Sequence, residues 1–191
     1  MKKRKVNLKE YNIDKTWTLF LDRDGVVNKR IIGNYILRWE DFEFLPGVLD
    51  AIKSFNKIFG KVVIVTNQQC IGKGIITENE LAALHEKMLK EIEKNGGAID
   101  AIFYAPLTRE SLHNIDRKPN VGMALKAKKK FPEINFKKAV MAGDSFSDME
   151  FGHRLSMITV LVNEDPVMAK DHPEVVCFWA RDLKEFSTQL N

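Results

Sequence analysis

The chain has 191 residues, of which 29% are charged and 45% hydrophobic, as in an ordinary globular domain. Its formal net charge of +4 equals the charge of Lys2, Lys3, Arg4 and Lys5, so the remainder is neutral overall, unlike a uniformly basic nucleic-acid-binding domain. No apolar stretch is long enough to span a membrane, and two cysteines are too few for a disulfide framework, so we expect a cytoplasmic protein.

The chain begins with a basic segment that we interpret as a solvated tail over residues 1–15. Residues 6–15 are polar and mixed rather than apolar, so we expect no signal peptide. A tail that binds DNA or a membrane surface is the alternative interpretation.

Residues 16–191 alternate strand-like and helix-like segments. Short apolar runs predict strands over residues 16–21, 61–66, 101–104, 139–142 and 157–162. Apolar residues at helical spacing predict helices over residues 46–59, 77–95, 121–130, 146–155 and 181–190. This alternation is typical of parallel strands joined by crossover helices, and it predicts a single α/β domain over residues 16–191.

The first predicted strand ends in two acidic residues, Asp22 and Asp24. On an extended segment, residues two apart point to the same side, so we expect the two carboxylates together and Arg23 pointing away. Carboxylates this close repel each other unless a cation or a proton lies between them. A divalent metal facing a phosphate is one solution, and a solvated acidic turn is the alternative.

Residues 26–45 do not fit the alternation of strands and helices. The pair Gly33-Asn34 favours a small hairpin over residues 31–36. Because this stretch follows the acidic pair directly, we expect it to lie over whatever binds there, with a plain surface excursion as the alternative.

Further polar residues occur at the ends of predicted strands or just before predicted helices. Thr66 and Asn67 supply a hydroxyl and an amide that suit phosphate oxygens. Lys118 would supply a positive charge, and Asp144 a third carboxylate. Each has an alternative interpretation when it is taken alone. Thr66 and Asn67 could form a turn, Lys118 could belong to a solvated charge cluster, and the loop of Asp144 could be a helix cap. Because ligands bind beyond the carboxyl ends of parallel strands, their common placement predicts one site.

This combination resembles the four motifs of the haloacid-dehalogenase-like (HAD) phosphatases. The motifs are Asp22-x-Asp24, Thr66, Lys118 and Gly143-Asp144-x-x-x-Asp148. Within that superfamily, residues 21–28, 42–48, 65–68 and 117–123 resemble the heptose-bisphosphate and histidinol-phosphate phosphatase branch. The resemblance implies a three-layer Rossmann-like parallel sheet with strand order 3-2-1-4-5 and no large cap domain.

The resemblance also implies a reaction, the hydrolysis of a phosphomonoester through an aspartyl-phosphate. Asp22 would be the nucleophile, and Asp24 would be the general acid and then the general base. Thr66 and Lys118 would hold the phosphoryl oxygens. Mg²⁺ would bind the Asp22 carboxylate, the Asp24 carbonyl and the Asp144 carboxylate.

Other residues receive supporting roles from the same resemblance. Asp148 would orient Lys118 or a metal-bound water. The residues expected to face the substrate are Asn28, Asn67, Lys73 and Arg117.

The branch usually carries a structural zinc loop with four Cys or His ligands. The matching stretches here, residues 104–108 and 114–116, contain neither cysteine nor histidine, and His113 is the only imidazole nearby. We therefore expect no structural zinc.

The expected substrate is a small phosphorylated metabolite, a sugar phosphate such as D-glycero-D-manno-heptose 1,7-bisphosphate. Histidinol phosphate is one alternative. A nucleic-acid end phosphatase is another, but the excess charge is in the tail rather than near the motifs. A non-catalytic binding protein is the third, although binding alone would not need both Asp22 and Asp24. We expect no nucleic-acid or membrane partner, and a monomer or weak homodimer.

Overall fold

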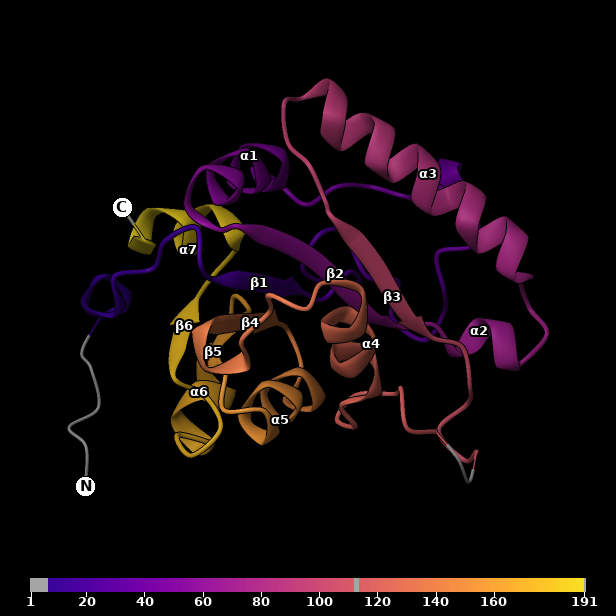
Figure 1. Ribbon diagram of the computed structural model, residues 1–191. Coiled ribbons are helices and arrows are strands. Elements are labelled where there is room, and N and C mark those ends of the chain that lie inside the picture. Colours follow the sequence, from indigo (N-terminus) through magenta and orange to yellow (C-terminus); the bar gives the residue numbers. More distant parts are fainter. Residues whose placement is uncertain (1–6, 112–113, 191) are drawn as a thin grey trace.

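A computed structural model describes residues 7–111 and 114–190 of the chain. Its centre is a parallel sheet with the order β3-β2-β1-β4-β5-β6 (Figure 1). The strands are β1 (Thr18–Leu21), β2 (Lys61–Asn67), β3 (Ala101–Ala105), β4 (Ala139–Gly143), β5 (Ile158–Val162) and β6 (Phe178–Ala180). The expected order 3-2-1-4-5 is confirmed and is extended by β6, a three-residue strand too short to show a clear period in the sequence.

Helices cover both faces of the sheet, which makes the three expected layers. On one face lie α1 (Val48–Ile58), α3 (Glu78–Lys94) and α7 (Leu183–Leu190). On the other lie α4 (Gly122–Lys130) and α5 (Phe146–Arg154). Short helices complete the order: α2 (Gln69–Gly72), α6 (Val167–Asp171), η1 (Leu8–Tyr11), η2 (Trp39–Asp41) and η3 (Phe136–Lys138).

The core follows from the two-residue period of the strands. In β1, Leu19 and Leu21 pack among the side chains of α1 and α7, whereas Phe20 packs on the opposite face with Phe151 of α5. Because both faces are covered, the central strands are apolar throughout. Polar residues are therefore confined to the strand ends, where the chain leaves the sheet.

The structure differs from the hairpin expected after β1. Residues 31–36, all of which are described, contain a turn in which the Asn34 amide donates to the Ile31 carbonyl, but no strand. An isolated two-stranded hairpin is only marginally stable, and Ile32 is 94% exposed, so little burial would support one. The hairpin prediction is wrong, although the turn at Gly33-Asn34 is present.

Part of the expected N-terminal tail packs against the domain. Helix η1 is closed by a capping box between Asn7 and Glu10, Leu8 is 2% exposed, and Tyr11 makes edge contacts with Trp17 and Phe178. The basic residues Lys2 to Lys5 lie outside the described residues. Across residues 7–111 and 114–190, no helix is both long and apolar enough to cross a membrane.

We expect the contact of η1 to contribute to stability. Replacing Leu8, which is buried, by alanine should lower the free energy of unfolding by about 2–3 kcal/mol, because it removes apolar contacts and leaves a cavity. Urea unfolding followed by circular dichroism measures this, with Ile32→Ala as the exposed control. Equal stability of the two variants would show that residues 7–15 do not belong to the cooperative unit.

Candidate active site

Most of the predicted site residues lie together at the carboxyl ends of β1, β2 and β4. A cavity of about 420 Å³ opens there. It is lined by Asp22, Arg23, Asp24, Arg30, Thr66, Asn67, Arg117, Lys118, Ser145, Ser147 and Asp148, and by residues of the 31–36 and 67–69 segments. The stretch after the acidic pair therefore lies over the site, as expected.

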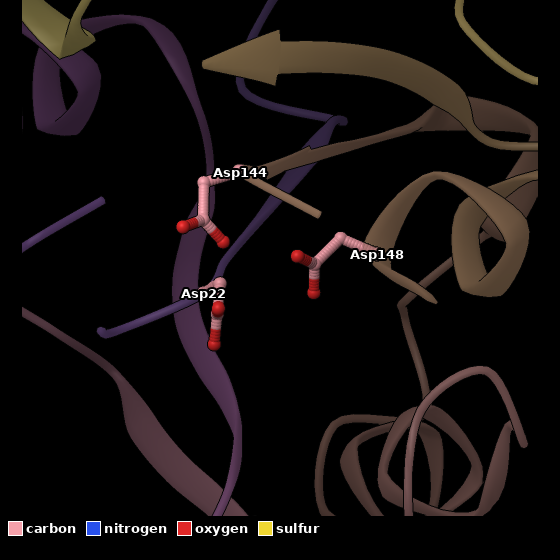
Figure 2. A group of neighbouring side chains, drawn as sticks. All are labelled: Asp22, Asp144 and Asp148. Atoms are coloured by element: carbon pink, nitrogen blue, oxygen red, sulfur yellow. The ribbon is translucent and has the colours of Figure 1, made fainter. Parts of the chain in front are cut away.

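Three carboxylates lie close together at this cavity, two of them in its lining (Figure 2). Asp22, Asp144 and Asp148 each bring an oxygen within 4.8 Å of the others. Burial, opposed by Lys118 and reinforced by Asp148, raises the pKa of Asp22 to about 6. Burial and the charges of Asp22 and Asp148 raise the pKa of Asp144 to about 8. Such a cluster needs nearby positive charge to be fully ionised at neutral pH.

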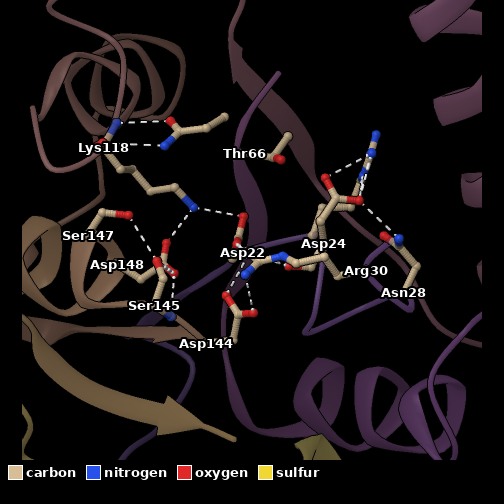
Figure 3. Close-up of polar contacts among 12 residues, drawn as sticks. Asp22, Asp24, Asn28, Arg30, Thr66, Lys118, Asp144, Ser145, Ser147 and Asp148 are labelled. Atoms are coloured by element: carbon tan, nitrogen blue, oxygen red, sulfur yellow. Dashed lines mark hydrogen bonds and ion pairs between the residues drawn. The ribbon is translucent and has the colours of Figure 1, made fainter. Parts of the chain in front are cut away.

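Lys118 supplies one of these charges from the loop before α4 (Figure 3). Its ammonium lies 2.7 Å from Asp22 Oδ1 and 2.5 Å from Asp148 Oδ1, and it donates to the Val65 carbonyl at 2.7 Å. Burial alone would lower the pKa of Lys118, but the two carboxylates outweigh it and raise that pKa. The ammonium is therefore held charged between the carboxylates.

Asn67 positions this lysine through its main chain. The Asn67 Oδ1 accepts from the Lys118 amide at 3.0 Å, and its Nδ2 donates to the Lys118 carbonyl at 3.3 Å. The amide group at the end of β2 thus ties the lysine loop to the sheet. Its side chain also lines the cavity, so it is placed to contact a ligand as well.

Asp148 is fixed at the start of α5. It accepts from the Ser145 amide at 3.0 Å and from the Ser145 hydroxyl at 2.5 Å. A Cβ on Gly143 would lie 2.2 Å from the Asp148 Cβ, so only glycine lets the turn come this close. The contact with Lys118 is one of the two that the resemblance implied for Asp148.

Asp24 has a different environment from Asp22. Its carboxylate accepts from Arg23 at 2.8 and 3.0 Å, from Asn28 at 3.0 Å and from Gln68 at 2.9 Å. Burial opposes ionisation, but these donors outweigh it and lower the pKa of Asp24.

The expectation that Arg23 points away from the acids is wrong, because the chain leaves the extended conformation after Leu21. The Arg23 carbonyl accepts from the amides of residues 26–28, and Gly25 has a φ of +92°. This turn folds the arginine back toward Asp24. Arg23 itself is buried, and its Nη1 lies 2.9 Å from His85 Nε2.

Sequence reasoning missed Arg30. Its guanidinium donates to the Asp24 carbonyl and Asp144 Oδ1, both at 3.0 Å, and lies 2.9 Å from Asp144 Oδ2 and 4.0 Å from Asp22 Oδ2. The available signal was a basic residue within the stretch expected to lie over the acids. No sequence period indicates which side chain of an irregular stretch turns inward.

The oxygen atoms at the centre of the site suit a hard divalent cation. They are the carboxylates of Asp22, Asp144 and Asp148, together with the main-chain carbonyl of Asp24, which already accepts from a cationic group. Two of the carboxylates have raised pKa values, so a cation would relieve their mutual repulsion. The donor set could therefore hold Mg²⁺, which prefers oxygen ligands.

Of the four residues expected to contact a substrate, two line the cavity and two do not. Asn67 and Arg117 line the cavity, and Arg117 Nη1 is buried with no hydrogen-bond partner among the described residues. Asn28 is buried and holds Asp24. Lys73 lies outside the lining, with its ammonium 5.7 Å from the centroid of the Tyr35 ring, and Tyr35 does line the cavity.

The loop that matches the zinc loop of the branch is held by hydrogen bonds in its described part. Asn114 Nδ2 donates to the Thr108 carbonyl at 2.7 Å, and Asn114 Oδ1 accepts from the Arg117 amide at 3.2 Å. One asparagine thus connects both arms of the loop. His113 lies outside the described residues, and the absence of structural zinc stays a prediction.

The chain is similar to known proteins over most of its length. Residues 9–183 match the family described as polynucleotide kinase 3 phosphatase. The chain is 39% identical over 153 residues to the D-glycero-alpha-D-manno-heptose-1,7-bisphosphate 7-phosphatase of Campylobacter jejuni, covering 79% of this chain and 85% of that protein. It is 34% identical over 140 residues to the enzyme of the same name from Mycobacterium bovis, covering 73% of each.

Solved structures show the same fold. The D,D-heptose 1,7-bisphosphate phosphatase of B. bronchiseptica, solved with magnesium and phosphate, has a TM-score of 0.82 at 28% identity, over 91% of this chain and 97% of that one. The corresponding protein of Burkholderia thailandensis has a TM-score of 0.64 at 27% identity, over 90% and 96%.

The buried His85 leads to a prediction about acid stability. Burial and the charge of Arg23 lower the pKa of His85 to about 3 from 6.5, so between these values the unfolded chain binds a proton that the folded chain does not. The contribution of neutral His85 to the free energy of unfolding is therefore complete above about pH 6.5 and is lost as the pH falls.

We expect wild-type protein to lose about 2 kcal/mol more stability than His85→Gln between pH 7 and pH 5, because glutamine keeps an acceptor for Arg23 but does not titrate there. Urea unfolding at the two pH values measures this. An equal loss in both proteins would show that His85 is protonated in the folded state.

Proposed function

Because the chain belongs to the polynucleotide kinase 3 phosphatase family, we propose that it removes the 7-phosphate of D-glycero-D-manno-heptose 1,7-bisphosphate. Its relatives place it in the heptose-bisphosphate branch of the HAD-like phosphatases, and it is a phosphatase. The observation that carries the proposal is the pairing of Asp22 with Lys118 inside a buried carboxylate cluster, a site that can both attack a phosphoryl group and neutralise it. Two free thiols, Cys70 and Cys177, are consistent with the cytoplasm as the proposed compartment.

Asp22 is the proposed nucleophile. Its carboxylate attacks phosphorus, the bond from phosphorus to the sugar oxygen breaks, and the leaving oxygen takes a proton from Asp24. The raised pKa of Asp22 means that the cations around it must hold it ionised for attack. Lys118 is already in contact with that carboxylate.

Asp24 is the proposed general acid and then the general base. Its donors favour the ionised form, which is the form that takes a proton from water as water attacks the aspartyl-phosphate. For the first step Asp24 must be protonated, and a phosphate dianion arriving beside it favours that protonation because like charges raise a carboxyl pKa. The two acids thus have separate tasks set by separate surroundings.

The remaining residues bind and orient the phosphate. Thr66 lies in the cavity, where its hydroxyl accepts from Gln68 at 2.9 Å and keeps its own proton for a phosphoryl oxygen. Asp148 would keep Lys118 oriented. Mg²⁺, held by the Asp22 and Asp144 carboxylates and the Asp24 carbonyl, would supply neutralising charge to the phosphoryl oxygens as their charge spreads.

The substrate is proposed to be selected by the rim of the cavity. We propose that Arg117 and Asn67 contact the part of the substrate nearest the reacting phosphate, and that Lys73 contacts the most remote part. Asn28, buried beneath Asp24, would act by holding that acid.

The mechanism predicts that hydrolysis requires Asp22 and Mg²⁺. Asp22→Asn should lower kcat at least about a thousand-fold, because an amide is a poor nucleophile, and this corresponds to about 4 kcal/mol. Steady-state phosphate release with and without EDTA measures it, with Asp50→Asn, an exposed acid, as control. Wild-type turnover in Asp22→Asn would exclude the mechanism.

The substrate assignment predicts a graded effect at the rim. Arg117→Ala should raise KM for the heptose bisphosphate about tenfold or more, because a charged hydrogen bond to the substrate is lost. Lys73→Ala should raise it about two- to threefold, because its charge is exposed to solvent.

The substrate panel contains the heptose bisphosphate, histidinol phosphate and a 3′-phosphorylated oligonucleotide. The highest kcat/KM is expected for the heptose bisphosphate. A higher value for either of the other two would reassign the substrate while leaving the phosphatase chemistry in place.

A further inference from the structure

Arg30 places its guanidinium against the oxygen atoms that could hold a cation in the carboxylate cluster. Its guanidinium contacts Asp144 through both terminal nitrogens, at 3.0 and 2.9 Å, and it donates to the Asp24 carbonyl at 3.0 Å. Asp22 Oδ2 is 4.0 Å away. One guanidinium thus spans groups from the loops after β1 and β4, as Figure 3 shows.

These are the same oxygen atoms that would coordinate Mg²⁺ under the proposed function. Mg²⁺ binds oxygen at about 2.0–2.1 Å, and the cavity centre cannot hold that ion and the guanidinium at once. If the ion and the guanidinium were bound together, two positive charges would also be in contact in a poorly solvated site. Arg30 and the metal are therefore alternatives at this position.

The charges in the cluster indicate why a counter-cation is needed. Asp22, Asp144 and Asp148 carry three negative charges when ionised, and Lys118 supplies one positive charge. Two negative charges then remain. Arg30 reduces them to one, and a divalent cation in place of Arg30 would cancel both. The arginine is thus a partial substitute for the ion.

The local structure allows Arg30 to leave without unfolding the segment. The segment is anchored by Asn28, which is 0% exposed, and by Ile36, which is 3% exposed. Between these anchors the Arg30 side chain is 47% exposed, and it has no partner in the described residues other than the site groups. A rotation of its side chain would clear the cluster while the main chain stays in place.

We propose that Arg30 is an internal counter-cation that neutralises the carboxylate cluster and is displaced when the divalent cation binds. This inference rests on the proposed metal-dependent phosphatase function. Its consequence is a competition, in which part of the binding free energy of the cation is used to break the Arg30 contacts. Arg30 is then a positioning residue that sets the affinity for the metal and stabilises the site when the metal is scarce.

The test measures metal binding directly, so it does not depend on turnover. Arg30→Gln keeps a hydrogen-bond donor but removes the charge, and Arg30→Lys keeps the charge without the two-nitrogen contact. Arg38→Gln is the matched control, because Arg38 lies in the same segment with a side chain 73% exposed. Mg²⁺ affinity is measured by calorimetry, and Mn²⁺ binding by electron paramagnetic resonance.

We expect Arg30→Gln to bind Mg²⁺ about tenfold more tightly than wild type, Arg30→Lys to fall between them, and Arg38→Gln to match wild type. In EDTA, Arg30→Gln should unfold at a lower temperature than wild type, and Mg²⁺ should raise its midpoint by more. Circular dichroism in Mg²⁺ establishes that each variant is folded.

Equal or weaker Mg²⁺ binding by folded Arg30→Gln would overturn the proposal, since competition predicts a gain. Tighter binding in a protein that hydrolyses none of the tested phosphates would support the counter-cation role while contradicting the proposed function. The two failures are therefore distinguishable.

Discussion

The site depends on one electrostatic constraint: two buried carboxylates and one half-buried carboxylate bring oxygens within 4.8 Å of one another at the edge of a parallel sheet. Isolated buried charges are costly, so the surrounding chain is arranged to supply positive charge. Lys118 enters from the loop before α4 and Arg30 from the loop after β1. Asn67 holds the first of these in place through main-chain hydrogen bonds.

The same constraint separates the two acids of the first motif. Asp22 is buried beside other carboxylates, which raises its pKa. Asp24, two residues later, is surrounded by donors from Arg23, Asn28 and Gln68, which lower its pKa. Groups of one chemical type whose surroundings move their pKa values in opposite directions suit different steps of one reaction. The turn over residues 23–28 creates this difference, because it brings the Arg23 and Asn28 donors to the Asp24 carboxylate.

The proposed selection of substrate relies on irregular segments, because no separate cap domain covers the cavity in the described part of the chain. The 26–45 segment and the loop around Arg117 form its walls. In the second of these, Asn114 joins both arms by hydrogen bonds to Thr108 and Arg117. This network orders a loop whose counterpart in the branch usually carries a metal, and it places Arg117 at the cavity.

The sequence pattern by itself determined the layered α/β architecture and the group of acids at the strand ends, and the family resemblance supplied the strand order. An apolar run such as residues 61–66 indicates a strand that is buried on both faces of the sheet. Parallel strands bring their carboxyl ends to one edge of that sheet. Asp22, Thr66 and Asp144 therefore had to meet there. Lys118 was also a candidate from its place before a predicted helix, and the family resemblance added Asp148, which contacts it.

Only the tertiary structure decided the contacts made outside regular elements. The return of Arg23 to Asp24, the entry of Arg30 into the carboxylate cluster and the packing of Leu8 all depend on segments without a repeating pattern. In such segments the direction of a side chain follows from what the rest of the fold places beside it. The physical reason is that a period constrains strands and helices locally, whereas charge pairing between distant loops is fixed only when the sheet brings them together.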